Sequence, residues 1–209
     1  MIIKAKHHWF IYPFFKFYAV YKISRHFIKV EINGEFEEKG LPVLLISNHL
    51  SWWDGFWAMY INVKLLHRKF HFMMLEEQLK RFSFFINTGG FSVRKGTRSV
   101  IESINYTIEL LSDSNNMVLL FPQGKISSIY DQSFIFERGI EHILKGIKGK
   151  VQIVFMANLV EYFSKEKPSL FIYLKEYSQA EYKTKKMQED YNKFYSECIA
   201  DNIKKAKYL

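Results

Sequence analysis

The order of apolar and polar residues predicts alternating strands and helices. Continuous apolar runs predict buried strands at residues 42–47, 69–75, 117–121, 151–157 and 169–174, with a shorter strand at 91–94. Helical spacing of apolar residues predicts helices at 8–28, 51–65, 76–86, 97–112, 137–147 and 179–206. The polar, glycine-containing stretch 31–41 is interpreted as a loop or short hairpin. This alternation predicts an α/β fold with a mixed, largely parallel sheet flanked by helices.

The first predicted helix combines many aromatic residues with flanking basic ones. No apolar run reaches the ~18 residues that a bilayer-spanning helix needs, and Lys16 interrupts the aromatic run. Aromatic rings and lysines together are typical of the head-group level of a membrane. Residues 1–30 are therefore predicted to form an amphipathic helix at the membrane interface; the alternative is a helix that only packs on the domain. The aromatic residues are Trp9, Phe10, Tyr12, Phe14, Phe15, Phe17, Tyr18 and Tyr21.

Length and charge narrow the class of protein. The 209 residues suit one domain, 1–209, and the formal net charge is +9. Such a charge attracts nucleic acid or anionic membrane lipids. The chain lacks zinc-finger spacing and an aromatic-basic RNA motif, so membrane lipids are the predicted partners and nucleic acid is not. Cys198 is the only cysteine, which excludes an intrachain disulfide and fits a reducing compartment.

The first group of candidate site residues directly follows the predicted strand 42–47. In Asn48-His49-Leu50-Ser51-Trp52-Trp53-Asp54, His49 is a candidate general base. Asp54, five residues later, is placed to hold the other ring nitrogen and stabilise the imidazolium. The alternative is structural, because Ser51 and Asp54 also fit a capping box and His49 can be an ordinary loop histidine.

A second group of site residues surrounds the predicted strand 91–94. Gly90 lets a ligand approach the backbone, and Arg94 and Lys95 can neutralise a phosphate. Neighbouring strand residues point to opposite faces, so only one of the two cations is expected in the site. The alternative is an exposed basic turn.

A third group follows the predicted strand 117–121. Gly124 allows a turn that aims backbone N–H groups at an anion, and Lys125 adds positive charge. The alternative is an ordinary turn that ends a strand. The candidate substrate-binding residues of this group are Phe121, Pro122, Gln123, Gly124 and Lys125.

Taken together, these groups resemble the three motif blocks of the glycerolipid acyltransferase family, typified by 1-acylglycerol-3-phosphate acyltransferase. The first block, N-H-x-x-x-x-D, is matched by Asn48, His49 and Asp54. The second, G-x-F-x-V-x-R, is matched by Gly89, Phe91 and Val93, with Lys95 in the place of arginine; the third, F-P-E-G-T-R-S, corresponds to residues 121–127. Residues 136–139 also resemble the F-K-x-G segment of the family, and the motif-bearing core spans residues 43–160.

The resemblance implies an acyltransferase in which His49 deprotonates an acceptor hydroxyl that attacks a thioester. Asp54 would orient His49, and the third block would help to bind the acceptor head group. The donor would be acyl-CoA or acyl-acyl-carrier protein, with no metal and no other cofactor. The expected location is peripheral, at the cytoplasmic face of the inner (plasma) membrane.

Several departures from the family pattern bear on the acceptor. Gln123 replaces a glutamate, Lys125 a threonine, Ile126 an arginine, and Lys95 the arginine of the second block. The first candidate acceptor is 1-acylglycerol-3-phosphate or a related lysolipid. A lyso-amino-acid lipid, such as a lyso-ornithine or lyso-glycine lipid, is the alternative acceptor. A non-catalytic basic membrane-binding module is the alternative from another class of protein.

Overall fold

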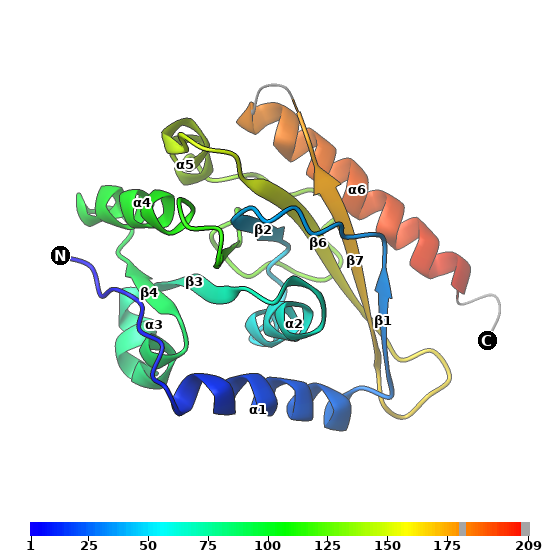
Figure 1. Cartoon of the computed structure of the whole chain (residues 1–209). Coiled ribbons are helices and arrows are strands. Elements are labelled where there is room, and N and C mark those ends of the chain that lie inside the picture. The colour runs from blue at the N-terminus through cyan, green and yellow to red at the C-terminus, as the bar shows by residue number, and fades with distance from the viewer. Residues whose placement is uncertain (180–182, 206–209) are drawn as a thin grey trace.

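The structure is a computed structural model that describes residues 1–179 and 183–205. In this part of the chain, seven strands form one sheet in the order β1-β7-β6-β2-β5-β3-β4 (Figure 1). The central strands β2 (Val43–Ser47) and β5 (Asn116–Leu120) are entirely buried. This sheet, parallel in all its strand pairs but one, confirms the predicted α/β class with a mixed, largely parallel sheet. The other strands are β1 (Lys29–Asn33), β3 (Lys69–Leu75), β4 (Gly90–Val93), β6 (Gln152–Glu161) and β7 (Ser169–Tyr177).

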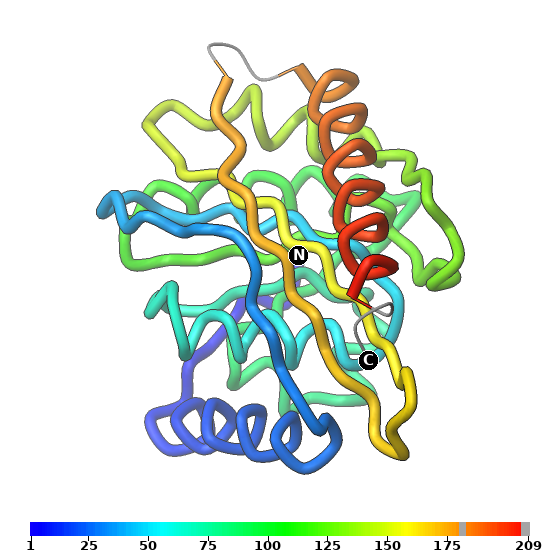
Figure 2. The backbone as a smooth tube through the Cα atoms, turned by 90° about the vertical axis from the view of Figure 1, so that its right-hand side faces the viewer, coloured from blue at the N-terminus to red at the C-terminus, as the bar shows by residue number. Residues whose placement is uncertain are grey.

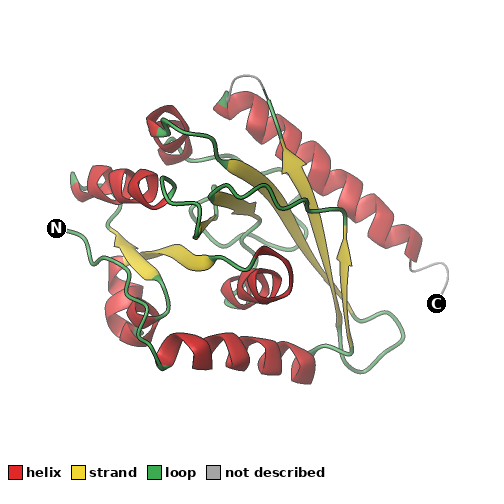
Figure 3. Ribbon diagram, in the orientation of Figure 1, coloured by secondary structure: helices red, strands yellow, loops and turns green. Residues whose placement is uncertain are grey.

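Helices cover both faces of the sheet, which gives three layers (Figure 3). Along β2, Leu44 and Ile46 face one apolar core, and Val43 and Leu45 face the other, because successive strand residues point to opposite faces. The first core is closed by α4 (Ser99–Leu110), α5 (Gly139–Gly146) and α6 (Thr184–Lys205). The second is closed by α1 (Ile11–His26) and α2 (Asp54–Ile61).

Shorter helical segments join these elements. The π-helical turn η1 (Asn62–Leu66) extends α2, so the predicted helix 51–65 is present as two pieces. The predicted helix 76–86 is likewise divided into α3 (Glu76–Arg81) and the 3₁₀ segment η2 (Ser83–Asn87). Residues 180–182 and 206, which belong to the predicted last helix, lie outside the described residues.

Strand direction decides where the site lies. β2 pairs in parallel with both β5 and β6, and β3 pairs in parallel with β5 and β4. The carboxyl ends of these strands therefore meet at one edge of the sheet, where sites form in open α/β sheets. Of the strand pairs in the described residues, only β6–β7 is antiparallel, and its hairpin is drawn in yellow at the lower right of Figure 2.

The interpretation of residues 31–41 as a loop or hairpin was wrong at its amino end. Residues 29–33 form β1, an edge strand that pairs in parallel with β7. Val30 and Ile32 alternate with polar neighbours and pack against the second core. Five residues with two apolar positions give a weak strand signal, and the partner strand lies about 140 residues further along the chain.

The N-terminal segment before α1 is part of the fold. Ser92 N–H donates to Ile3 O at 2.9 Å and Gly89 N–H donates to Lys6 O at 3.1 Å, so this segment lies along the β4 edge. α1 then buries Phe15, Ala19 and Ile23 against the second core. No helix in residues 1–179 and 183–205 is both long and apolar enough to cross a membrane.

Candidate active site

The three motif blocks follow strands whose carboxyl ends share one edge of the sheet. His49 comes two residues after β2, and Phe121 directly follows the neighbouring strand β5. Their rings stack at 4.1 Å between centroids, with an interplanar angle of 10°. Arg94 and Lys95 follow β4 at the same edge. The topology therefore brings together groups that are separated by more than 70 residues in the sequence.

His49 and Asp54 form the central pair of the site. His49 Nδ1 lies 2.7 Å from Asp54 Oδ2, the distance of a charge-assisted hydrogen bond. The Asp54 side chain is 1% exposed, whereas that of His49 is 24% exposed. With Nδ1–H donated to Asp54, the lone pair lies on Nε2 at the other edge of the ring. This is the arrangement of a base held by a carboxylate.

The Asp54 carboxylate also organises the turn that carries His49. Asp54 Oδ2 accepts hydrogen bonds from the backbone N–H groups of Leu50 (2.7 Å) and Ser51 (2.9 Å), and Oδ1 accepts from Ser51 Oγ (3.1 Å). α2 begins at Asp54 itself, after Trp53 at the cap position. The catalytic and structural interpretations of Asp54 are thus compatible, because one buried carboxylate serves both the ring and the turn.

Gln123 links the first and third blocks. Its Oε1 accepts a hydrogen bond from the backbone N–H of His49 at 2.8 Å, and its Nε2 donates to Ser127 Oγ at 3.0 Å. Ser127 N–H in turn donates to His49 O at 2.9 Å. Gln123 is 5% exposed. Its side chain therefore points into the junction between the two blocks.

The two adjacent cations of the second block take different directions. Arg94 Nη2 pairs with Glu76 Oε1 at 2.6 Å, and this contact together with Lys80 lowers the pKa of Glu76 to about 2. Lys95 Nζ instead donates to Gly124 O at 2.7 Å and lies 3.5 Å from Glu137 Oε1. Lys95 is thus the cation that the structure joins to the third block.

The other predicted binding residues fall into two groups. Gly124 has a φ of +63°, which favours glycine, and Lys125 beside it is exposed. Pro122 is buried, and its carbonyl accepts a hydrogen bond from Glu137 N–H at 2.8 Å. Gly90, by contrast, begins β4 at the other end of that strand, where an added Cβ would lie 2.7 Å from Phe85 O. Gly90 is therefore not among the residues brought to the site edge.

Some residues that support the site were not predicted from the sequence. Asn48 Nδ2 donates to Asn158 O at 3.0 Å, and Asn158 N–H donates to Asn48 Oδ1 at 2.9 Å, so β6 holds the residue next to His49. On α6, Asn192 accepts from Phe134 N–H at 2.9 Å and Gln188 accepts from Phe136 N–H at 2.8 Å. These bonds hold the loop that follows the third block. They could not be predicted, because no sequence motif indicates which side chains of α6 contact this loop.

Cys198 is buried on α6, and burial raises the pKa of its thiol to about 12, so this side chain has the properties of a structural cysteine rather than of a nucleophile. Within residues 1–179 and 183–205, no three His, Cys, Asp or Glu side chains gather as a metal site would require.

The fold and the site define the class of protein. A model of the Acyltransferase family matches residues 28–173, well over half of the chain. The chain therefore belongs to the Acyltransferase family and is an acyltransferase, which confirms the resemblance carried by the three blocks.

One solved structure places the fold more closely. The chain is similar to the crystal structure of the 1-acyl-sn-glycerophosphate (LPA) acyltransferase PlsC from Thermotoga maritima, with a TM-score of 0.57 and 14% identity, over 92% of this chain and 78% of that one. At this identity the likeness concerns the fold. A comparison with curated protein sequences gave no match.

Proposed function

We propose that this acyltransferase moves a fatty acyl group from a thioester, acyl-CoA or acyl-acyl-carrier protein, to a hydroxyl of a lysolipid at a membrane surface. The observation that carries the proposal is the His49–Asp54 pair, 2.7 Å apart at the carboxyl end of a central strand. The acyltransferase PlsC from Thermotoga maritima, named for a glycerophosphate acceptor, shares the fold.

The chemistry follows from the ring geometry. His49 Nε2 removes the proton of the acceptor hydroxyl as its oxygen attacks the thioester carbonyl, and Asp54 stabilises the imidazolium that forms. The tetrahedral intermediate collapses with loss of the thiolate, which takes up the proton held by His49. Phe121, stacked on the imidazole, keeps the ring in one plane while both steps occur.

The acceptor head group would be anionic, because two lysines lie at the turn of the third block. Lys95 is fixed beside Gly124 O, and Lys125 is the next residue along the turn. Lys95 remains 52% exposed, so its ammonium is accessible to a phosphate as well as to Glu137. A Lys95–Lys125 pair favours a phosphate-bearing acceptor such as 1-acylglycerol-3-phosphate over a neutral lipid.

The acceptor would come from a membrane, since aromatic side chains cover the outer side of α1. Phe10, Phe14, Phe17 and Tyr21 recur at helical spacing and are 48–69% exposed. Aromatic contacts lead from α1 toward His49 through the buried Phe56, whose ring lies 6.2 Å from that of Tyr18 and 4.7 Å from that of Trp52. Trp52 is 56% exposed and follows His49 by three residues, so a membrane-bound acceptor would meet the base near the interface.

The test is acyl transfer by purified protein with radiolabelled acyl-CoA and, separately, acyl-acyl-carrier protein. His49→Ala should lower turnover by at least ~100-fold, the scale of a positioned base. His142→Ala, at an exposed position of α5, is the matched control and should retain activity. A folded His49→Ala protein with turnover near that of the wild type would exclude His49 as the base.

A panel of acceptors identifies the substrate. 1-Acylglycerol-3-phosphate should be the best acceptor, and Lys95→Gln with Lys125→Gln should raise its KM more than the KM of a neutral lysolipid. The departures at Lys125 and Ile126 favour including a lyso-ornithine and a lyso-glycine lipid. If the wild-type protein prefers either of these lipids, the acceptor is an amino-acid lipid and not 1-acylglycerol-3-phosphate.

A further inference from the structure

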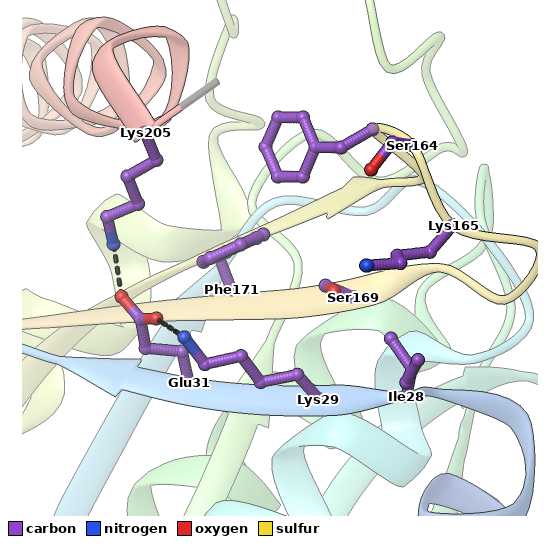
Figure 4. Close-up of a pocket in the computed structure, with 9 residues that line it drawn as sticks. Ile28, Lys29, Glu31, Ser164, Lys165, Ser169, Phe171 and Lys205 are labelled. Atoms are coloured by element: carbon purple, nitrogen blue, oxygen red, sulfur yellow. Dashed lines mark hydrogen bonds and ion pairs between the residues drawn. The ribbon is translucent and has the colours of Figure 1, made fainter. Parts of the chain in front are cut away.

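A pocket lies at the edge of the sheet that is remote from β4. It has a volume of about 450 Å³ and is formed by β1, β7, the β6–β7 hairpin and the end of α6 (Figure 4). β7 is separated from β2 by β6, and the pocket shares no lining residue with the His49 site. The volume lies in the range of small-molecule sites.

The pocket walls combine apolar rings with ammonium groups. Phe163 and Phe171 pack edge to face, 5.9 Å between centroids, and Ile28 lies across the pocket. The charged side chains of the lining are Lys29, Lys165, Lys205 and Glu31. Three ammonium groups face one carboxylate, so the pocket carries a net positive charge and is complementary to an anion.

The three lysines differ in the number of ion pairs and hydrogen bonds that they form. Lys205 is held by Glu31, by Asn33 Oδ1 at 3.0 Å and by Asp201 at 3.3 Å. Lys29 shares Glu31 at 2.6 Å but is 61% exposed, and Lys165 forms no ion pair within the described part of the chain. Lys29 and Lys165 are thus the groups available to a ligand.

One wall residue adopts an unusual backbone conformation. Phe163 has a φ of +46°, in the left-handed region that a bulky residue rarely occupies. The fold keeps this unfavourable conformation, which holds the Phe163 ring against Phe171 at the pocket wall. Backbone strain of this kind is often stored at ligand-binding sites.

The pocket opens beside the end of α1. Ile28 N–H donates to Pro168 O at 2.9 Å and Lys167 Nζ donates to Arg25 O at 3.3 Å, so the hairpin is fastened to the last turn of α1. Ile28 and Tyr162 are both 57% exposed. Exposed apolar side chains therefore stand on the chain at both sides of the point where the hairpin meets α1.

We propose that this pocket binds the phosphate head group of an anionic phospholipid as a non-reacting ligand. Lys29 and Lys165 hold the phosphate, and Phe163 with Phe171 contacts the first part of the acyl chain. The apolar walls favour a lipid over a free phosphate ion. The inference rests on the proposed function only in that the lipid belongs to the membrane surface on which α1 lies.

Binding is tested with monomeric dihexanoyl phosphatidylglycerol by titration calorimetry, with dihexanoyl phosphatidylcholine and inorganic phosphate as comparison ligands. The wild-type protein should bind the phosphatidylglycerol most tightly. Lys29→Gln with Lys165→Gln should weaken this binding by about fivefold per lysine. Lys205 still satisfies Glu31 in that variant. Lys148→Gln with Lys150→Gln removes the same charge at the opposite end of β6 and should have no effect.

A third variant separates a lipid from a free anion. Phe163→Asn tolerates the left-handed conformation but removes the ring, so it should weaken binding of the lipid and not of inorganic phosphate. Equal binding of inorganic phosphate and lipid, or equal losses in the two lysine pairs, would overturn the proposal. The lysine variant should retain acyl transfer in detergent micelles and His49→Ala should retain lipid binding, so failure here is distinguishable from failure of the proposed function.

Discussion

The side chain of Gln123 accepts a hydrogen bond from the backbone N–H of His49 at 2.8 Å. Its other polar atom donates to Ser127 Oγ, and Ser127 closes the connection by donating to His49 O. The oxygen and the nitrogen of this buried amide therefore both form hydrogen bonds, and these bonds join the two loops. We expect Gln123 to position His49 rather than to contact the acceptor.

Gln123→Glu should be tolerated. A carboxylate can accept from His49 N–H, and the Ser127 hydroxyl can rotate to donate to it. Turnover should stay within about threefold, and the ranking of acceptors should not change. Gln123→Leu leaves the His49 N–H without its partner, which costs roughly 1–3 kcal/mol of stability, and displacement of His49 should lower kcat on the order of tenfold or more. Kinetics over the acceptor panel check this: a large change in acceptor KM for Gln123→Glu at constant kcat would show contact with the acceptor.

Two substitutions of Asp54 separate charge from turn geometry. Asp54→Asn keeps an oxygen for the Leu50 and Ser51 N–H groups, so the midpoint of thermal unfolding should change little. It removes the charge that stabilises the imidazolium, so turnover should fall by at least ~100-fold. Asp54→Ala should lower both turnover and stability. Asp54→Asn with wild-type turnover would reduce Asp54 to a structural residue.

The site blocks were predictable because their chemistry depends on local order. A strand followed by Asn-His, and another followed by Phe-Pro-Gln-Gly, places residues at strand ends, and parallel pairing then brings the ends together. The alternation of strand residues predicted that Arg94 and Lys95 differ in direction, but not which of them joins the third block. That choice depends on Glu76, the first residue of α3, and on Gly124 after β5. The partners of Gln123 likewise belong to loops that meet only in the folded chain.

The edges of the fold were harder to predict than its centre. The buried strands β2 and β5 give continuous apolar runs. β6 and β7 extend beyond the predicted 151–157 and 169–174 because the hairpin pairs them as far as Glu161 and Tyr177. α1 was predicted from its residue types. The sequence did not indicate which side of the helix would be buried. In the structure Phe15 packs inward, whereas Phe14 and Phe17 are exposed.

The exposed side of α1 should control binding to vesicles. Phe14→Gln with Phe17→Gln removes two exposed rings and leaves the buried Phe15, Ala19 and Ile23 in place. Cosedimentation with phosphatidylcholine–phosphatidylglycerol vesicles should weaken by on the order of tenfold or more, since each ring contributes apolar area to the interface.

The matched control replaces two exposed apolar residues elsewhere by glutamine. Ile101→Gln on α4 and Ile203→Gln on α6 should leave vesicle binding unchanged. Equal losses in both proteins would place the membrane surface elsewhere. Deletion of residues 1–22 is a poorer test, because it also removes the backbone hydrogen bonds to β4 and part of the second core.

His7 and His71 connect the N-terminal segment to the sheet and make its stability depend on pH. Their rings lie 4.7 Å apart, edge to face, and His7 Nε2 lies 2.8 Å from Phe70 O. Burial lowers the pKa of each imidazole to about 4, and the neighbouring Lys69 acts in the same direction. Both rings are therefore neutral in the folded protein at pH 7.

Stability should fall as the pH is lowered from about 6.5 to about 4. In this window the unfolded chain takes up protons on both histidines while the folded protein does not, so the free energy of unfolding rises with pH. Urea denaturation between pH 7 and pH 4.5 should show this slope, largely before carboxylates titrate. His71→Asn, which cannot be protonated in this range, should flatten the slope even if it lowers the stability at pH 7. His142→Asn, at an exposed position, should leave the slope unchanged. A slope that is the same in all three proteins would mean that the His7–His71 contact does not govern the acid sensitivity of the fold.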